Sequence, residues 1–372
     1  MRVIVVGAGV LGTMHAWQAV ERGHRVVHLE REEQARGASV RNFGLVWVGG
    51  RADGPELETA LRARELWEQI GARVPEVGWR PAGSLTVLRT EAEHAVARAA
   101  AARPDAARRG YALLDAAATR SRNPALRGDL LGALHCERDA VLEPRPAQRA
   151  LQDALRASGR YTFLGGREAR EVHGTAVRDD HGETHRGDAA VLCTGAWLGG
   201  LVRELAPELP VRRVRLQMMQ TAPLGERLPT AVADADSFRY YPAYRGPALD
   251  ALRAGQPQPP VAARHRTQLL MVQRADGSLT IGDTHEYDTP FGFDVTEDAY
   301  AHLAATAADL LGRPLPGVRR RWAGVYAQCT EPDRVVERRR LDGGAVLVTG
   351  PGGRGMTCAP AIAEATADEM DW

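Results

Sequence analysis

The feature that most restricts the fold of this chain is the glycine motif Gly7-Ala8-Gly9-Val10-Leu11-Gly12. It follows the β-branched run Val3–Val6, which is typical of a strand buried on both faces of a parallel sheet. A helical pattern over Thr13–Arg22 comes next, and Gly23 ends it. A second apolar run, Val26–Glu30, finishes in an acid. This order of strand, glycine turn, helix and strand predicts a dinucleotide-binding unit.

Each part of the motif has a physical task in such a unit. Gly7 permits the tight turn, Gly9 lets the backbone approach a pyrophosphate, and Gly12 lets the helix pack closely on the strand. The helix N-terminus offers free N–H groups and positive potential to the phosphates. Glu30 is expected to accept hydrogen bonds from the adenosine ribose, which disfavours NADP. We therefore expect the cofactor to contact Gly7, Gly9, Val10, Leu11, Gly12, Glu30 and the adjoining Arg31.

Three further segments favour FAD over NAD. Arg36–Gly44 is a polar loop at a place where an NAD-binding domain normally continues into a helix. The apolar runs Ala189–Cys193 and Ala345–Thr349 each end in a glycine turn, and a helix is expected over Ala359–Met370. Such a helix N-terminus can stabilise negative charge on a reduced flavin. These segments are expected to contribute the following residues to the FAD-binding site: Ser39, Arg41, Asn42, Thr194, Gly195, Trp197, Gly352, Gly353, Arg354, Gly355, Met356 and Thr357.

Charge and composition disfavour several other classes of protein. The chain has 48 basic and 47 acidic residues, so neither nucleic acid nor an anionic membrane is an expected partner. All 48 basic residues are arginine, which leaves no lysine for a Schiff base or a general base. The 4 cysteines and 11 histidines show no metal-binding spacing, so no metal site is expected. Without a signal peptide or a long apolar run, the expected location is cytoplasmic.

Over nearly its whole length the sequence resembles the D-amino-acid oxidase superfamily, which includes glycine oxidase and sarcosine oxidase. Within it, the chain is most similar to a bacterial subfamily of FAD-dependent oxidoreductases associated with phosphonate breakdown. The segments that carry this narrower resemblance are Ala38–Gly44, Tyr240–Ala243, Gln273–Tyr287, Arg321–Tyr326 and Gly350–Thr357. The resemblance implies an α/β fold, in which a glutathione-reductase-like, Rossmann-type FAD-binding domain is interleaved with an antiparallel-sheet substrate domain.

The same resemblance implies a reaction. A small primary or secondary amine, such as 2-aminoethylphosphonate or its N-methyl derivative, would lose a hydride to flavin N5, and the imine would hydrolyse to an aldehyde. A rival within the superfamily is a glycine-, sarcosine- or D-amino-acid-type oxidase, which acts on an amino carboxylate. Outside catalysis, a flavin-binding protein without activity is the alternative. The two extra glycine turns disfavour an NAD-dependent dehydrogenase, and nothing in the sequence indicates an oligomeric state.

The superfamily layout and the local patterns divide the chain between two domains. The FAD-binding domain is expected in three segments and the substrate domain in two: 1–78, 143–210 and 318–372, and 79–142 and 211–317. A helix is expected over Leu57–Gly71, and another starts near Pro144, which suits the first position of a helix. The Pro- and Gly-rich stretch Gly246–Pro260 is expected to be a surface loop, either plain or a lid.

In this superfamily arginine and tyrosine side chains of the sheet hold an anionic substrate, while the protein orients the amine and excludes water. Arg239, Tyr240 and Tyr241 are candidates for this task; the alternative is an aromatic cross-strand pair with an exposed arginine. His285 is a candidate on its motif, with a surface histidine as the alternative. Arg354 either binds an anion or faces solvent.

Two departures from the family concern the cofactor and the electron acceptor. Sarcosine oxidases link FAD through a cysteine, and Cys329 lies a few residues after the corresponding position in this chain. Asn42 stands where some relatives have a flavin-linking histidine. Bound FAD is therefore expected to be non-covalent. The lysine that sarcosine oxidases use toward O₂ corresponds to about Thr280. A positive charge must then come from Arg354 or a protonated His285, or an electron acceptor other than O₂ is used.

Overall fold

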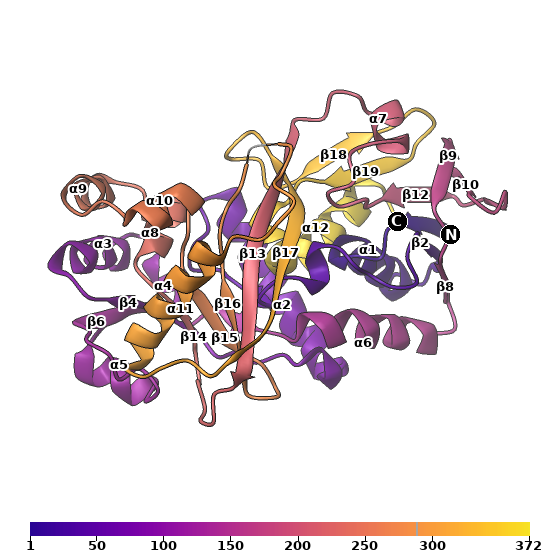
Figure 1. Cartoon of the computed structure of the whole chain (residues 1–372). Helices are drawn as coiled ribbons and strands as arrows, with labels where there is room; N and C mark the ends of the chain where they lie inside the picture. Colours follow the sequence, from indigo (N-terminus) through magenta and orange to yellow (C-terminus); the bar gives the residue numbers. More distant parts are fainter. Residues whose placement is uncertain (288) are drawn as a thin grey trace.

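The computed structural model describes residues 1–287 and 289–372, and its strands form two large sheets with helices around them (Figure 1). The first sheet has six strands in the order β18 (Glu337–Arg340), β19 (Val346–Thr349), β12 (Ala189–Leu192), β1 (Arg2–Val6), β2 (Arg25–Glu30) and β8 (Tyr161–Gly165). Its strands run parallel except β18, which is antiparallel to β19. This mainly parallel sheet, alternating with helices, confirms the predicted α/β nucleotide-binding fold.

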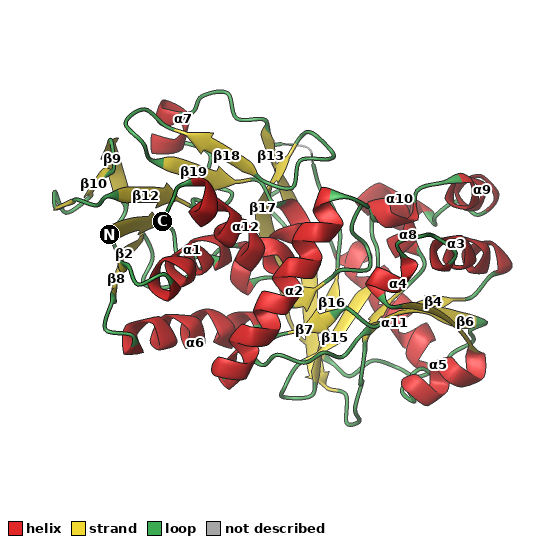
Figure 2. Ribbon diagram, turned by 180° about the vertical axis from the view of Figure 1, so that it is seen from behind, coloured by secondary structure: helices red, strands yellow, loops and turns green. Residues whose placement is uncertain are grey.

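Alternate residues of β1 enter two different apolar cores. Val3 and Val5 pack with a layer of helices, whereas Ile4 and Val6 face the opposite core. Burial of each such side chain stabilises the fold by about 1.5–3 kcal/mol. Figure 2 shows the helices of this layer in red beside the yellow strands. The helices of the first layer are α1 (Val10–Glu21), α2 (Pro55–Arg73), α6 (Pro144–Ala157) and α12 (Gly355–Glu369). The second core is covered by α7 (Leu201–Leu205) and by a small sheet of β11 (Thr184–His185), β10 (Ala176–Asp179) and β9 (Ala169–His173).

The first helix lies against the first strand because Gly12 carries no side chain. Gly7 has a φ of +93°, and a Cβ on Gly12 would lie 1.8 Å from the Gly7 carbonyl oxygen. The N–H of Thr13 donates to the Gly9 carbonyl at 2.9 Å. The helix α1 therefore begins inside the glycine motif, earlier than the predicted start at Thr13.

The second large sheet has eight strands and crosses the middle of the molecule. Their order is β17 (Val318–Cys329), β13 (Val211–Pro223), β16 (Ser278–Gly282), β15 (Leu270–Gln273), β14 (Ala231–Ala233), β4 (Ser84–Leu88), β6 (Gly132–Cys136) and β5 (Tyr111–Asp115). Among the described strands the pairs are antiparallel except β14 with β4. The long strands β13 and β17 run between the part that holds both termini and the part that holds β4 and α3 (Glu91–Ala101) (Figure 1).

Strand β17 lies in this second sheet, although residues 318–329 were expected with the FAD-binding segments. It pairs with β13 from the Val211–Cys329 pair to the Thr221–Val318 pair. A strand pattern in the sequence does not say which sheet a strand joins, because pairing partners are set by distant residues. We keep the division into two domains as a proposal, with β17 assigned to the substrate domain.

The two faces of the eight-stranded sheet pack against different parts of the chain. The helix α11 (Glu297–Leu311) packs on one face against Met219 and Ile281. The other face carries Met218 and Leu270, which pack in one cluster with Trp47 and Tyr241. This second face is therefore turned toward residues that follow the glycine motif in the sequence.

The last helix, α12, is joined to α2 by a hydrogen bond beside a proline. It begins at Gly355, earlier than the predicted start at Ala359, and contains Pro360. Pro360 has no N–H to donate to the carbonyl of Met356. The indole Nε1 of Trp67 in α2 donates to that carbonyl at 2.9 Å instead, so a buried acceptor is satisfied across two helices.

The stretch Gly246–Pro260, expected as a surface loop, contains the helix α9 (Pro247–Gly255). Pro247 occupies its first turn and Leu249 and Leu252 are buried, so the flanking prolines and glycines concealed a short amphipathic helix. The remaining elements are α4 (Ala106–Arg109), α5 (Ala116–Arg122), α8 (Asp236–Tyr240), α10 (Pro260–His265), β3 (Leu45–Val46), β7 (Ala140–Val141), η1 (Ala38–Val40), η2 (Pro75–Val77), η3 (Pro242–Tyr244) and η4 (Gly352–Arg354).

We expect Gly12→Ala to displace α1 from β1, because its Cβ would overlap the Gly7 carbonyl. Overpacking of this kind costs about 1–3 kcal/mol, and the turn that approaches the cofactor would move with the helix. Thermal denaturation and FAD titration of the apoprotein should both show the loss. Gly255→Ala is the matched control, since nothing lies within 4 Å of its Cβ position. Normal FAD affinity in Gly12→Ala would contradict this account.

Candidate active site

A cavity of about 1030 Å³ is lined by residues of both large sheets. It extends from Gly7 and Glu30, at the carboxyl ends of β1 and β2, to Tyr240 and His285. Its volume lies at the upper end of the range for ligand pockets, as a dinucleotide requires. All predicted cofactor and substrate residues line this cavity except Gly12, which instead sets the approach of α1 to β1.

Glu30 is held at the fingerprint end of the cavity by two backbone donors. Its Oε2 accepts from Ala8 N at 2.7 Å and its Oε1 from Glu32 N at 3.1 Å. Each oxygen keeps a lone pair for a further donor, such as a ribose hydroxyl. Burial raises the pKa of Glu30, which these backbone bonds partly offset. The neighbouring Arg31 lies over the Trp197 ring, with 4.3 Å between its Cζ and the ring centroid.

The loop that follows β2 is fixed by its own side chains. The hydroxyl of Ser39 accepts from Val10 N at 2.8 Å, at the start of α1. The amide of Asn42 donates to the carbonyls of Ala38 and Ser39, both at 2.9 Å, and accepts from Gly44 N at 2.6 Å. Asn42 therefore shapes the loop, and its own polar atoms are already partnered there.

Arg41, on the same loop, donates to the carbonyls of Arg36 and Ala323 at 2.8 and 2.9 Å. The second of these bonds joins the loop to β17. Two of its three donor nitrogens are thus used to hold the protein together, whether or not it also contacts a ligand.

Three features of the cavity fit a bound FAD. The hydroxyl of Thr194 is buried without a hydrogen-bond partner among the described residues. Gly353 carries no side chain and lines the cavity near the Tyr240 and Tyr326 hydroxyls, so its backbone is open to a ligand at this wall. The N-terminus of α12 opens into the same space, where it can stabilise negative charge.

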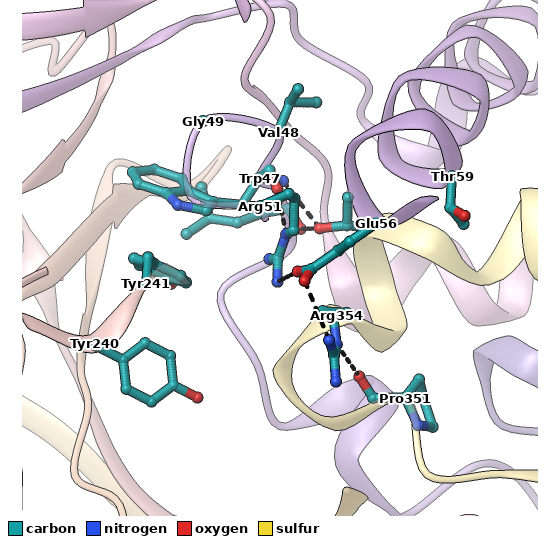
Figure 3. Close-up of polar contacts among 12 residues, drawn as sticks. Trp47, Val48, Gly49, Arg51, Glu56, Thr59, Tyr240, Tyr241, Pro351 and Arg354 are labelled. Carbon is teal, nitrogen blue, oxygen red and sulfur yellow. Dashed lines mark hydrogen bonds and ion pairs between the residues drawn. The ribbon is translucent and has the colours of Figure 1, made fainter. Parts of the chain in front are cut away.

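Three buried charged residues form an ion cluster beside this wall (Figure 3). Arg51 Nη1 lies 3.6 Å from Glu56 Oε1, and Arg354 Nη1 lies 3.3 Å from Glu56 Oε2. All three side chains are less than 10% exposed. One carboxylate is shared by two guanidinium groups, so the cluster has a net charge of +1.

The two arginines of this cluster differ in how many donors they have left. Arg354 also donates to the carbonyls of Pro351 and Arg334 at 3.1 and 3.2 Å, so each of its nitrogens has a partner. Arg51 Nε donates to the Trp47 carbonyl at 2.7 Å, but within residues 1–287 and 289–372 neither of its Nη atoms makes a hydrogen bond. Burial lowers the pKa of Arg51, yet Glu56 together with Cys358, Tyr241 and Tyr240 outweighs this effect, so the pKa is raised. Arg51 is thus a charged residue with free donors at the cavity.

Aromatic rings form the opposite part of the wall. The rings of Tyr240 and His285 are stacked at 4.0 Å, and Tyr241 meets Tyr240 edge-on at 4.9 Å. Trp47, on the other side of Tyr241, lies 5.7 Å from it. Burial raises the pKa of Tyr240, Tyr241 and Tyr326, so their hydroxyls stay protonated and can donate.

Two of the expected substrate residues behave differently from the simplest expectation. Arg239 Nε donates to Asp236 at 2.8 Å and Arg239 also donates to the Gln256 carbonyl, so its charge is paired. Burial lowers the pKa of His285 to about 4, so its imidazole is neutral near neutral pH. The positive charge expected from Arg354 or His285 thus comes from the ion cluster, in which Arg51 has the free donors.

Cys329 also lines the cavity, but burial raises the pKa of its thiol to about 11. The thiolate, which is the nucleophilic form, is therefore disfavoured. This agrees with non-covalent FAD, which stays a prediction. Thr280 lies in the interior of β16 between Gln220 and Val272.

Several cavity residues were missed in the sequence: Trp47, Arg51, Glu56, Gln268 and Asp283. The signal at Arg51 was weak. It follows Gly49-Gly50, and a Cβ on Gly50 would lie 2.5 Å from the Tyr241 ring and 2.6 Å from Trp47 Nε1. A glycine pair next to an arginine therefore marked a crowded site, although the crowding comes from distant residues.

Comparison with known proteins identifies the family. The model of the DAO family, described as FAD dependent oxidoreductase, matches residues 2–369. The chain belongs to this family. It is therefore an FAD-dependent oxidoreductase, and FAD is its cofactor. This confirms the predicted superfamily and cofactor.

Individual relatives of this DAO-family chain agree in length and fold. Glycine oxidase of Pseudomonas aeruginosa is 28% identical over 408 residues, which covers 99% of this chain and 94% of the relative. The crystal structure of glycine oxidase from Bacillus cereus superposes with a TM-score of 0.80 at 18% identity, covering 99% and 96% of the two chains. Iminodiacetate oxidase from Chelativorans sp. BNC1 gives a TM-score of 0.76 at 18% identity, covering 98% and 93%.

The part of the chain that the structure describes also brings together a cluster of metal-ligand atoms outside the cavity. It consists of Asp179, Glu183 and His185, but Arg167 Nη1 lies 2.6 Å from Asp179 and 3.1 Å from Glu183. A guanidinium thus occupies the position of an ion there. None of the described helices is both long and apolar enough to span a membrane.

We expect Glu30→Gln to weaken FAD binding, because a neutral amide replaces a charged acceptor of ribose hydroxyls. Hydrogen bonds to charged groups contribute about 1.5–3 kcal/mol, which corresponds to roughly a ten- to hundred-fold higher Kd. FAD titration of the apoprotein, followed by flavin fluorescence quenching, measures the change. Glu33→Gln is the control, since Glu33 is exposed and does not line the cavity. Unchanged FAD affinity in Glu30→Gln would assign the ribose to other residues.

Proposed function

We propose that this protein oxidises a small amine that carries a carboxylate group. The observation that supports this most directly is the buried ion cluster, whose net positive charge is presented to the cavity by the free Nη atoms of Arg51. An uncompensated buried charge is costly unless a partner arrives, so an anionic group of the substrate is a natural partner. The protonated tyrosine hydroxyls in the same cavity add uncharged donors for that group.

In this proposal the protein mainly binds, orients and dehydrates the substrate. FAD, when bound, accepts the two electrons and the hydrogen of the amine's α C–H bond. Arg51 binds the carboxylate, which fixes one end of the substrate. The rings of Trp47, Tyr240 and Tyr241 exclude water from the rest of the molecule and restrict its orientation. The imine then hydrolyses in water to a carbonyl compound and an amine or ammonia.

The ion cluster favours a carboxylate over the phosphonate implied by the sequence resemblance. A carboxylate carries one negative charge, which matches the net charge of the cluster. A phosphonate carries up to two charges near neutral pH and would leave one without a buried partner. The named relatives support the same choice, because glycine oxidase and iminodiacetate oxidase are named for amino carboxylates. The electron acceptor is O₂ or another oxidant, and the cationic cluster would favour formation of anionic superoxide from O₂.

The proposal is tested by anaerobic mixing of the FAD-loaded protein with glycine, sarcosine, D-alanine, iminodiacetate, 2-aminoethylphosphonate and its N-methyl derivative. We expect an amino carboxylate to bleach the flavin absorbance fastest. Ethylamine, which has no anion, should bleach it far more slowly. Faster bleaching by an aminophosphonate would favour the phosphonate reaction, and no bleaching by any amine would favour a flavin-binding protein without this activity.

We expect Arg51→Gln to lower kcat/KM for the amino carboxylate about ten- to hundred-fold, because a charge-assisted hydrogen bond of roughly 1.5–3 kcal/mol is lost. The rate with ethylamine should change little, since that substrate has no carboxylate to bind. Arg227→Gln, at an exposed arginine away from the cavity, is the matched control. Equal losses with both substrates would indicate a structural role of Arg51 instead.

A further inference from the structure

Two buried hydrogen-bond acceptors lie unsatisfied in the cavity wall, at a place distinct from the ion cluster. Gln268 Oε1 and Asp283 Oδ1 have no hydrogen-bond partner among the described residues, and the two residues are 2% and 5% exposed. Their backbones pair, with Asp283 N donating to Gln268 O at 2.8 Å and Gln268 N to Asp283 O at 3.2 Å. A buried polar group without a partner costs about 1–3 kcal/mol, so a ligand that brings donors is expected here.

The Gln268 side chain partly offsets the rise in the pKa of Asp283, and the titratable groups that face Asp283 among the described residues are uncharged at neutral pH. On its own segment they are His285, whose Nε2 lies 3.9 Å from Asp283 Oδ2, and Tyr287. Tyr240 and Tyr241 face it from α8 and the residue after it, and Tyr326 from β17. His285 Nδ1 bonds the Arg266 carbonyl at 3.1 Å, so the proton of the neutral imidazole is at Nδ1 and Nε2 is a further acceptor.

The two ends of the cavity therefore carry opposite kinds of hydrogen-bonding groups. Arg51 offers unpaired donors and a positive charge, and it lies 5.7 Å from the centroid of the Tyr241 ring. The Tyr241 hydroxyl in turn lies 3.5 Å from Gln268 Nε2, next to the unpaired acceptors. Acceptors at one end and cationic donors at the other match a zwitterion, whose ammonium group needs acceptors and whose carboxylate needs donors.

We propose that Asp283 is the base that accepts a proton from the substrate ammonium group, while Gln268 Oε1 accepts a second N–H and orients the nitrogen. This proposal rests on the proposed function. One N–H bond of the ammonium group breaks, its electron pair stays on nitrogen, and the proton forms an O–H bond with Asp283 Oδ1. The product is the neutral amine, whose lone pair is required for loss of hydride from the α carbon. The step needs no oxidant or further reactant.

The acidity of Asp283 suits this transfer. Burial raises the pKa of Asp283 to about 8, which brings it within roughly two units of an alkylammonium group with a pKa of about 10. Such a small gap allows nearly balanced proton transfer. The folded-state pKa is raised, so the carboxylate form that acts as base is populated above about pH 8 and is lost as the pH falls below it.

The test is the pH dependence of kcat/KM for glycine or sarcosine, measured by anaerobic flavin bleaching in the FAD-loaded protein. With Asp283 as base, the wild-type value rises up to about pH 8 and falls again above about pH 10, where the substrate amine is already neutral and no longer binds to the Asp283 carboxylate as an ammonium ion. Asp283→Asn can use only the free amine. At pH 7 it should lose about a hundred-fold, from the two-unit difference in pKa, and its profile should rise to about pH 10 without a falling limb.

A binding experiment separates this role from a structural one. The probes are 2-aminoisobutyrate, which has no α hydrogen to lose, and isobutyrate, which has no amine; both are titrated by the change in flavin absorbance. Wild-type protein should bind the amine-containing probe more tightly, and Asp283→Asn should lose that preference while it still binds isobutyrate. Asp283→Glu should recover the falling limb, and Asp250→Asn on the exposed face of α9 should match wild type.

Each outcome bears on a defined claim. An Asp283→Asn profile that keeps the falling limb and stays within about two-fold of wild type at pH 7 would overturn the role of Asp283, while the proposed function would stand. Loss of isobutyrate binding in this variant would assign Asp283 to the structure of the cavity and would also overturn the proposal. If none of the amino carboxylates bleaches the wild-type flavin, the proposed function fails and this inference fails with it.

Discussion

The wall of the cavity depends on one buried carboxylate, Glu56, that lies between two buried guanidinium groups. Arg51 precedes it by a few residues, whereas Arg354 comes from the turn before the last helix. A buried charge that loses its partner costs about 3–5 kcal/mol, so the three residues must come together or not be buried at all. This requirement brings the start of α2 to the start of α12, and the cavity forms beside that contact.

The same arrangement leaves the cavity with opposite electrical character at two places. The excess charge lies at Arg51, while the unpaired acceptors lie at Gln268 and Asp283. Aromatic rings separate the two, and each ring contacts the next. A substrate with one anion and one ammonium group would therefore be bound in a single direction, which is the condition that transfer from one specific C–H bond imposes.

The parts of the fold that could be predicted from the sequence are those with local causes. The glycine motif, the buried strand before it and Glu30 after it lie within one short stretch, and residues close in sequence determine their geometry. Strand β17 was expected with the FAD-binding segments because its pattern is that of any strand, and its partner β13 lies about a hundred residues away. The helix α9 was hidden by the prolines and glycines at its ends.

The site divides in the same way. The predicted cofactor residues other than Gly12 line the cavity, and they could be proposed from the sequence because a glycine turn directly after a buried strand is a local pattern typical of nucleotide sites. Arg51 and Asp283 were missed because an arginine or an aspartate is ordinary in a sequence, and only burial against distant residues makes either unusual. Arg239 drew attention through its tyrosine neighbours, yet its charge is paired with Asp236.

The bond from Trp67 to the carbonyl that Pro360 leaves free has a mechanical consequence. An ordinary helix can slide along its neighbour by exchanging one set of side-chain contacts for another. In α12 a slide of one residue would leave this buried carbonyl unsatisfied and would place the proline ring in a different environment. The hydrogen bond of the indole thus fixes the register of α12 against α2. The glycine turn at the head of α12 lines the cavity, so the Trp67 bond also bears on the position of the cavity wall.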